Sequence, residues 1–175
     1  FRSLGVDMVQ FTPNWQVVRK LMFESLKRRG DFCWHCHCGV YTYPMWEAIR
    51  REVPLVLYGE KAEYDSFYEN FDDEWENDER RFNLKINLGI NAEDMLGMLD
   101  DSVGGYPVTE RDLRSYSFPP RKLLREKKID AQFLGNYMPW DLPKQVGIIK
   151  SELGWEGDDV EGVPPRYDYE KIECV

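Results

Sequence analysis

The residues best suited to chemistry lie in one short segment, Asp31–Pro44, "DFCWHCHCGVYTYP". It holds three of the chain's four cysteines and both of its histidines within six consecutive positions. Cys33 and Cys36 have the C-x-x-C spacing that lets two thiolates reach one tetrahedral zinc ion. We expect an extended loop here, in which neighbouring side chains point in different directions. The sequence therefore predicts half of a structural zinc site, with Cys33 and Cys36 as ligands and Cys38 as a weaker candidate.

Two other interpretations of the cysteines stay open. The first is a redox or catalytic thiol pair, although a thioredoxin-type pair usually opens a helix directly after a strand, which is not the arrangement we expect. The second is ordinary buried cysteines, which are common, since one C-x-x-C is a weak signal by itself.

The elements that would position this segment alternate in the manner of α/β proteins. The expected order is a strand at Val6–Phe11, a helix capped by Asn14 and ended by "KRRG", a helix opened by Pro44, and a strand at Pro54–Glu60. The apolar run "PLVLYGE" is typical of a strand buried on both faces. Ligands of such sheets bind at the carboxyl ends of strands, so Glu60 is our candidate catalytic or binding acid.

The rest of the chain divides into two further parts. An acidic, aromatic stretch begins at Lys61 and is long for a connection within a domain. We therefore expect an α/β core over residues 1–60, a helical insertion or lid over 61–130, and a return to the core, with the start of a C-terminal region, over 131–175. Expected features within these parts are helices capped by Asn91, Thr109 and Asp141, a strand at "AQFLG", and a basic cluster of Arg114, Arg121, Lys122 and Arg125.

Composition narrows the class of protein. The chain has 175 residues and a formal net charge of −9, which disfavours a general nucleic-acid binder. No apolar run reaches the roughly eighteen residues of a membrane span. The first residues lack the pattern of a signal peptide. We therefore expect a cytoplasmic protein that binds neither nucleic acid nor membrane.

Several segments together resemble the N-acetyl sugar amidotransferase family. They are "FTPN", "GDFCWHCHCGVYTYPMWEAIRREVPLVLYGE", "AEY", "LGINAEDMLGML", "FLGNYMPWD" and "YEKIEC". The resemblance implies a Rossmann-like parallel sheet of the PP-loop ATP pyrophosphatase type. It also implies an enzyme that uses ATP and magnesium to convert an acetamido group of a nucleotide-linked bacterial sugar into an acetamidino group. Such sugars belong to lipopolysaccharide and flagellin glycans, and a glutaminase partner often supplies the ammonia.

The resemblance also suggests roles for particular residues. Cys33 and Cys36 would hold structural zinc. Glu60, Glu63 and Tyr64 would face the nucleotide or sugar, as would Asn14, for which a plain N-cap is an equal alternative. The basic cluster offers Arg121 and Arg125 to the pyrophosphate of the substrate, although such clusters are often only solvated surfaces. Trp140 and Asp141 are further candidates for contacting the sugar.

One motif of the family is missing. Its phosphate-binding loop, of the S-G-G-x-D-S type, does not occur in these 175 residues. We therefore expect this chain to be an internal piece of the enzyme, inactive by itself. Two alternatives remain: a PP-loop enzyme of the tRNA-thiolation type, in which a C-x-x-C can be catalytic, and a non-catalytic, zinc-stabilised module that docks a partner.

Overall fold

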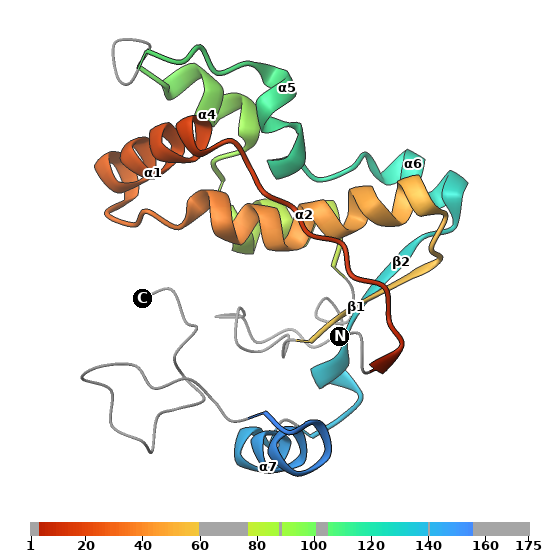
Figure 1. The fold of residues 1–175 in the computed structure, drawn as a ribbon. Coiled ribbons are helices and arrows are strands. Elements are labelled where there is room, and N and C mark those ends of the chain that lie inside the picture. Colours follow the sequence, from red (N-terminus) through yellow and green to blue (C-terminus); the bar gives the residue numbers. More distant parts are fainter. Residues whose placement is uncertain (1–3, 60–76, 88, 101–104, 140, 156–175) are drawn as a thin grey trace, which may run out of the picture.

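The computed structural model describes residues 4–59, 77–87, 89–100, 105–139 and 141–155. Within these ranges the chain combines helices with a two-stranded parallel sheet, so the expected α/β class is confirmed in this coarse sense (Figure 1). The elements are α1 (Trp15–Arg29), α2 (Trp34–Arg51), β1 (Leu55–Tyr58), α3 (Glu79–Arg81), α4 (Ala92–Met98), α5 (Glu110–Leu113), α6 (Arg121–Lys127), β2 (Asp130–Phe133) and α7 (Leu142–Leu153). No helix in these ranges is both long enough and apolar enough to cross a bilayer.

The first helix, α1, begins and ends as its sequence predicts. The Oδ1 atom of Asn14 accepts a hydrogen bond from the Gln16 N–H at 2.9 Å, which satisfies one of the unpaired donors of the first turn. Three cations occupy the last turn. Gly30 then takes a left-handed conformation with φ 73° and donates its N–H to the Leu26 carbonyl, the usual way in which glycine ends a helix.

The segment before α1 is not a strand. Val6–Phe11 is irregular, and its large apolar side chains are exposed. Phe11 instead stacks on Tyr43 with ring centroids 4.2 Å apart. The prediction of a strand here is wrong because a strand needs a neighbour to pair with, and the described part of the chain provides none for this segment.

The second helix starts ten residues earlier than predicted. α2 begins at Trp34, and Pro44 lies inside it rather than at its first turn. The proline leaves the Val40 carbonyl without its usual intrahelical donor, yet the helix continues. The reason is tertiary burial: Trp34, Cys38 and Tyr41 all face the core. α2 runs through the middle of the molecule, with α1 near its beginning and β1 at its end (Figure 1).

Among the described residues, α2 covers one face of the sheet. β1 and β2 pair in parallel, with Leu55 opposite Asp130 and Tyr58 opposite Phe133. The Tyr58 hydroxyl donates to the Tyr41 carbonyl of α2 at 2.8 Å, and Tyr58 and Phe133 are buried. On the other face Leu55 and Leu57 are 45% and 56% exposed. The predicted burial of β1 on both faces is therefore wrong, because α2 packs against one side and no described helix covers the other.

The shorter helices follow their predicted caps. In α4 the side chain of Asn91 accepts from Asp94 N–H, and that of Asp94 accepts from Asn91 N–H. The same reciprocal box joins Thr109 and Asp112 at the start of α5. Asp141 accepts from Lys144 N–H at the start of α7. These local hydrogen bonds fix helix starts without help from the rest of the fold.

Candidate functional site

The C-x-x-C pair lies in the first turn of α2, not in an extended loop. Cys33 is the N-cap residue, and its N–H donates to Oδ1 of Asp31 at 2.7 Å. Cys36 is the third helical residue. Cys33 is 3% exposed, and Cys36 is half-buried. The expectation of an extended segment is therefore wrong. The helical conformation lets the neighbouring Trp34 bury its side chain in the core.

This position suits two thiolate ligands. Cys33 and Cys36 are three positions apart at the start of a helix, a spacing that places residues on neighbouring parts of its surface. The N-terminus of a helix also stabilises negative charge. Two cysteines at this spacing are compatible with two of the four ligands of a zinc ion, and the zinc site stays a prediction. The described residues contain no group of three or more Cys, His, Asp and Glu that could hold a metal, and Cys174 lies outside them.

Cys38 has a different environment from the pair. It is fully buried, and burial raises the pKa of its thiol, an effect that the nearby charge of Arg29 only partly offsets. Two residues along a helix correspond to a rotation of about 200°, so Cys38 faces away from Cys36. Its neutral thiol packs as a small apolar group in the core.

One structural feature favours the redox alternative: the C-x-x-C pair lies at the start of a helix. The expectation that the pair does not open a helix is wrong, since Cys33 caps α2. However, α2 follows α1 through a short connection and not a strand. Only part of the thioredoxin-type arrangement is therefore present, and the redox interpretation stays open beside the metal one.

A buried hydroxyl lies next to the cysteines. The Tyr116 ring packs 6.1 Å from that of Trp34, and a methyl group at Gly39 would meet it at 3.5 Å. The Tyr116 hydroxyl has no hydrogen-bond partner within the described ranges. Burial is the main cause that raises the pKa of Tyr116 to about 12. The hydroxyl is therefore protonated and unsatisfied at neutral pH.

Replacing this tyrosine with phenylalanine is expected to stabilise the protein. An unpaired buried hydroxyl costs about 1 kcal/mol or more, and Tyr116→Phe removes it while keeping the ring contacts with Trp34 and Gly39. We expect the free energy of unfolding in urea to rise by about 1 kcal/mol. A fall of similar size would mean that the hydroxyl has a hydrogen-bond partner in solution.

The basic cluster expected from the sequence is divided in the fold. Arg114 places its guanidinium over the Trp46 ring, 4.8 Å from the centroid. Lys122 lies 3.8 Å from Glu126 on the surface. Only Arg121 and Arg125 share a pocket, which has a volume of about 450 Å³ and lies between α6, the start of β2 and the residues before α3.

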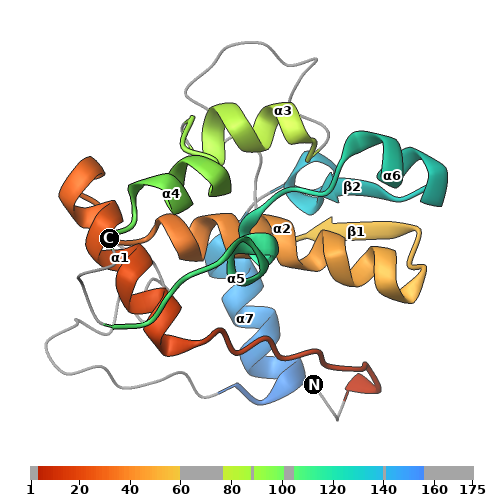
Figure 2. The same ribbon diagram turned by 90° about the horizontal axis from the view of Figure 1, so that it is seen from above.

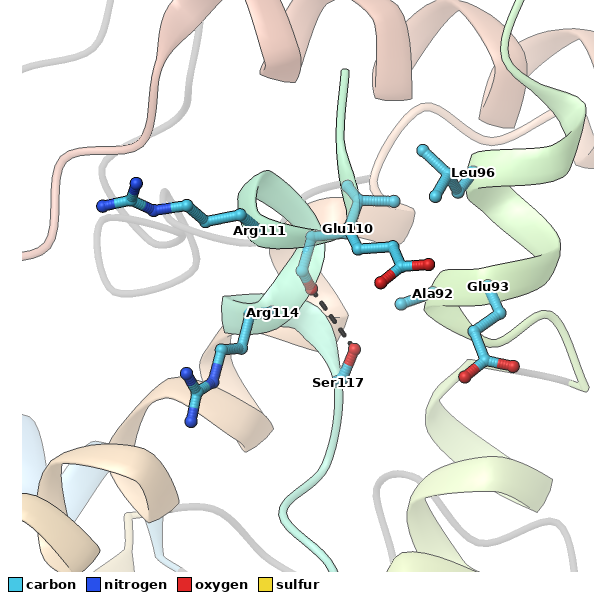
Figure 3. Close-up of a pocket in the computed structure, with 8 residues that line it drawn as sticks. Ala92, Glu93, Leu96, Glu110, Arg111, Arg114 and Ser117 are labelled. Atoms are coloured by element: carbon cyan, nitrogen blue, oxygen red, sulfur yellow. Dashed lines mark hydrogen bonds between the residues drawn. The ribbon is translucent and has the colours of Figure 1, made fainter.

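A second pocket of about 450 Å³ lies between α4 and α5. Figure 3 shows Glu110 directed toward α4, whereas Arg111 and Arg114 extend away from it. The lining also includes Glu93, which the family resemblance left without a role. The Ser117 hydroxyl already donates a hydrogen bond to the Leu113 carbonyl at 3.3 Å. The carboxylates of Glu93 and Glu110 would suit cations or hydroxyl donors, and we assign this pocket no function.

The remaining predicted site residues fall into two groups. Asn14 caps α1 through its side-chain oxygen, so its structural role is confirmed and its binding role stays a prediction. The others lie outside the described residues: Glu60, Glu63, Tyr64 and Trp140.

Two residues of the pocket beside β2 were missed by the sequence reasoning. Lys128 lines it together with Arg121 and Arg125, and the spacing of these three along one helical face could have revealed it. Asn77, which also lines the pocket, gave no signal, because an asparagine at the end of an acidic stretch looks like any surface residue.

Comparisons with known proteins add no family to this picture. No protein-family model matches the chain, and no curated protein matches it. The N-acetyl sugar amidotransferase family therefore enters below as a proposal, based on the quoted motifs and on the geometry just described.

Proposed function

We propose that this chain is part of an ATP-dependent N-acetyl sugar amidotransferase. The complete enzyme would act in the cytoplasm on a nucleotide-linked sugar and take ammonia from a glutaminase partner. Its core would be a Rossmann-like sheet of the PP-loop type, to which β1 and β2 belong. The chain by itself would be inactive, since these 175 residues contain no S-G-G-x-D-S motif.

The chemistry answers a specific difficulty. An amide carbon is a poor electrophile, and its oxygen is a poor leaving group. Transfer of the adenylyl group of ATP to the amide oxygen releases pyrophosphate and turns that oxygen into part of a good leaving group. Ammonia then adds to the carbon and AMP departs, which leaves the amidine. The site must exclude water, which would attack the same carbon.

The residues of this chain would serve binding and support. Arg121 and Arg125 would contact the substrate phosphates, and Glu60, with Glu63 and Tyr64, would face the nucleotide or sugar. Cys33 and Cys36 would hold a zinc ion, which supplies cross-linking of the fold and takes no part in the reaction.

The structural observation that most supports this proposal is the parallel pairing of β1 with β2. Parallel strands need a crossover connection, and here the crossover includes α6, which packs beside β2 (Figure 2). A Rossmann-like core is built from such units. An antiparallel hairpin at these two positions would have been incompatible with it.

The zinc part of the proposal can be tested on this chain alone. Co²⁺ bound by thiolates gives a strong charge-transfer absorption in the near ultraviolet. We expect this absorption from the native chain and its loss in the Cys33→Ser, Cys36→Ser double variant, because both thiolates would be ligands.

The matched control is Cys38→Ser. This thiol is buried on another side of α2, so the variant should keep the cobalt absorption. An equal loss in the control, or no absorption from the native chain, would contradict the assignment of Cys33 and Cys36.

The activity requires a longer protein. The DNA upstream of the codon for Phe1 should be sequenced, and a protein that includes any in-frame S-G-G-x-D-S motif should be purified. We expect this protein to form AMP from ATP only when a nucleotide-linked acetamido sugar and ammonium are both present. AMP formation that depends on tRNA instead would favour the thiolation alternative, and specific partner binding without turnover would favour the docking module.

A further inference from the structure

The outward side of α1 carries a groove that the rest of the described chain leaves open. α1 packs against α2 and α4 with its buried side (Figure 1). Its opposite side holds an apolar groove with a volume of about 560 Å³. Trp15, Phe23 and Leu26 on this side are 67%, 48% and 52% exposed. Apolar side chains gathered in this way on a surface mark a site for an interaction partner.

The groove runs between two rows of side chains along the helix. Each row follows the four-residue spacing that forms a ridge on a helix surface. One row consists of Trp15, Arg19 and Phe23, and the other consists of Val18, Met22 and Leu26. A ridge of side chains from another helix fits between two such rows, which is how helices pack against one another in proteins. The shape of the groove therefore indicates a helical partner.

The charge of the groove is positive. Among the described residues that line it, Arg19 is the only charged one. Lys27 continues the same row toward the end of α1 and is exposed. Neither cation forms an ion pair with another described residue. The helix as a whole has five lysines and arginines and one glutamate, although the chain has a net charge of −9. This surface therefore favours a partner with negative charge.

The same charges disfavour a second copy of this chain as the partner. Pairing of two copies through α1 would place the cations of one copy beside those of the other, which is unfavourable. A helix with glutamate or aspartate along one flank of its apolar face would instead complement Arg19 and Lys27. Residues eight positions apart on a helix are separated by about 12 Å along its axis. The two acidic residues of the partner should therefore be seven or eight positions apart.

We propose that the groove of α1 binds an acidic amphipathic helix of another protein. The apolar side chains of this helix lie between the two rows, and its carboxylates contact Arg19 and Lys27. Trp15 and Leu26 are the main anchors, because tryptophan and large apolar side chains contribute most when they are buried at an interface. This surface does not depend on the amidotransferase, and neither proposal needs the other.

The first experiment uses two synthetic helical peptides with the same face of leucines. One peptide carries glutamates on the flanks of this face, and the other carries lysines. Each peptide is labelled with a fluorophore, and its anisotropy is measured while the chain is added. We expect saturable binding of the glutamate peptide and binding of the lysine peptide that is about tenfold weaker or more. Equal affinities, or no saturable binding of the glutamate peptide, would overturn the proposal.

A double variant locates the binding surface. Trp15→Ala, Leu26→Ala is expected to bind the glutamate peptide about tenfold more weakly or worse, because both anchors are lost. Both side chains are exposed, so the variant should fold as the native chain does. The matched control is Ile148→Ala, Leu153→Ala, which removes two exposed apolar side chains from α7 and should leave the affinity unchanged. Equal weakening in the two double variants would contradict the assignment of the groove.

A charge reversal tests the preference for acidic partners. Arg19→Glu is expected to weaken binding of the glutamate peptide and to strengthen binding of the lysine peptide, since the sign of the charge in the groove changes. Lys122→Glu reverses a charge on the surface of α6 and should alter neither affinity. If Arg19→Glu leaves both affinities unchanged, the groove does not select its partner by charge and the proposal is wrong.

Two further measurements detect other occupants of the groove. A dimer in sedimentation equilibrium that Trp15→Ala, Leu26→Ala dissociates would identify a second copy as the occupant. Failure of the longer protein to bind the glutamate peptide, when this chain binds it, would mean that another part of the same protein covers the groove. Either result overturns the proposal. Neither bears on sugar-dependent AMP formation, which tests the proposed function separately.

Discussion

Replacing Trp34 with alanine is expected to lower the free energy of unfolding by about 3–5 kcal/mol. Trp34 is fully buried, and its indole N–H donates to the Ile90 carbonyl at 2.9 Å. That hydrogen bond joins the start of α2 to the residue before the cap of α4. The alanine variant would leave both a large cavity and an unpaired carbonyl. Urea denaturation followed by far-ultraviolet circular dichroism measures the loss without depending on tryptophan fluorescence.

The chain provides its own control in Trp15. This tryptophan is 67% exposed, so Trp15→Ala should change the free energy of unfolding by no more than about 0.5 kcal/mol. If Trp34→Ala proves unable to fold, Trp34→Phe retains most of the volume and should show an intermediate loss. Similar effects of Trp15→Ala and Trp34→Ala would contradict the placement of these two side chains.

Replacing Phe133 with alanine is the second large effect, again about 3–5 kcal/mol. Phe133 is fully buried at the end of β2, with the Tyr58 and Tyr41 ring centroids 5.5 and 6.2 Å away. The guanidinium of Arg81 lies 4.6 Å from its ring centroid. Removal of the ring would therefore open a cavity between the sheet, α2 and α3, and would take away the cation–π contact of a buried arginine. The urea midpoint of the purified chain is the measurement.

Leu57 tests whether only one face of the sheet is covered. It lies on β1, opposite Gln132, and is 56% exposed. Leu57→Ala is expected to cost less than about 1 kcal/mol, since it removes little buried surface. A loss as large as that of Phe133→Ala would mean that something covers this face of the sheet in solution.

Local signals in the sequence predicted where several helices begin or end. Asn14, Asn91, Thr109 and Asp141 cap helices as expected, and Gly30 ends α1. These predictions succeed because a cap depends on hydrogen bonds between residues two to four positions apart, which any fold can contain. The strands predicted at "PLVLYGE" and "AQFLG" are present in shorter form as Leu55–Tyr58 and Asp130–Phe133, since strand propensity is visible in a short run.

The face that a helix buries was not predictable in the same way. Trp15, Val18, Met22 and Leu26 recur at helical spacing, yet the residues α1 buries include Lys20, Glu24 and Ser25. The apolar stripe, with Leu26 52% exposed, points outward. Glu24 is accommodated by an ion pair with Arg28 at 3.3 Å, and the Ser25 hydroxyl donates to the Asp31 carbonyl. Which face of α1 is buried depends on the elements that pack against it. The spacing of apolar residues along the helix does not reveal those elements.

The candidate sites also combine features that the local sequence predicts with features that only the tertiary structure decides. The spacing of Cys33 and Cys36 is a local property, so the sequence alone could offer the pair as candidate zinc ligands, a prediction that stays open beside the redox one. That this pair caps a helix was decided by the burial of Trp34, a contact with a residue more than fifty positions away. The pocket of Arg121, Arg125 and Asn77 was likewise decided by tertiary structure, since pairing of β1 with β2 and docking of residue 77 on β2 bring distant segments together. Hydrogen bonds between neighbouring residues can be predicted from the sequence. Burial of side chains and contacts between distant segments form only when the whole chain folds.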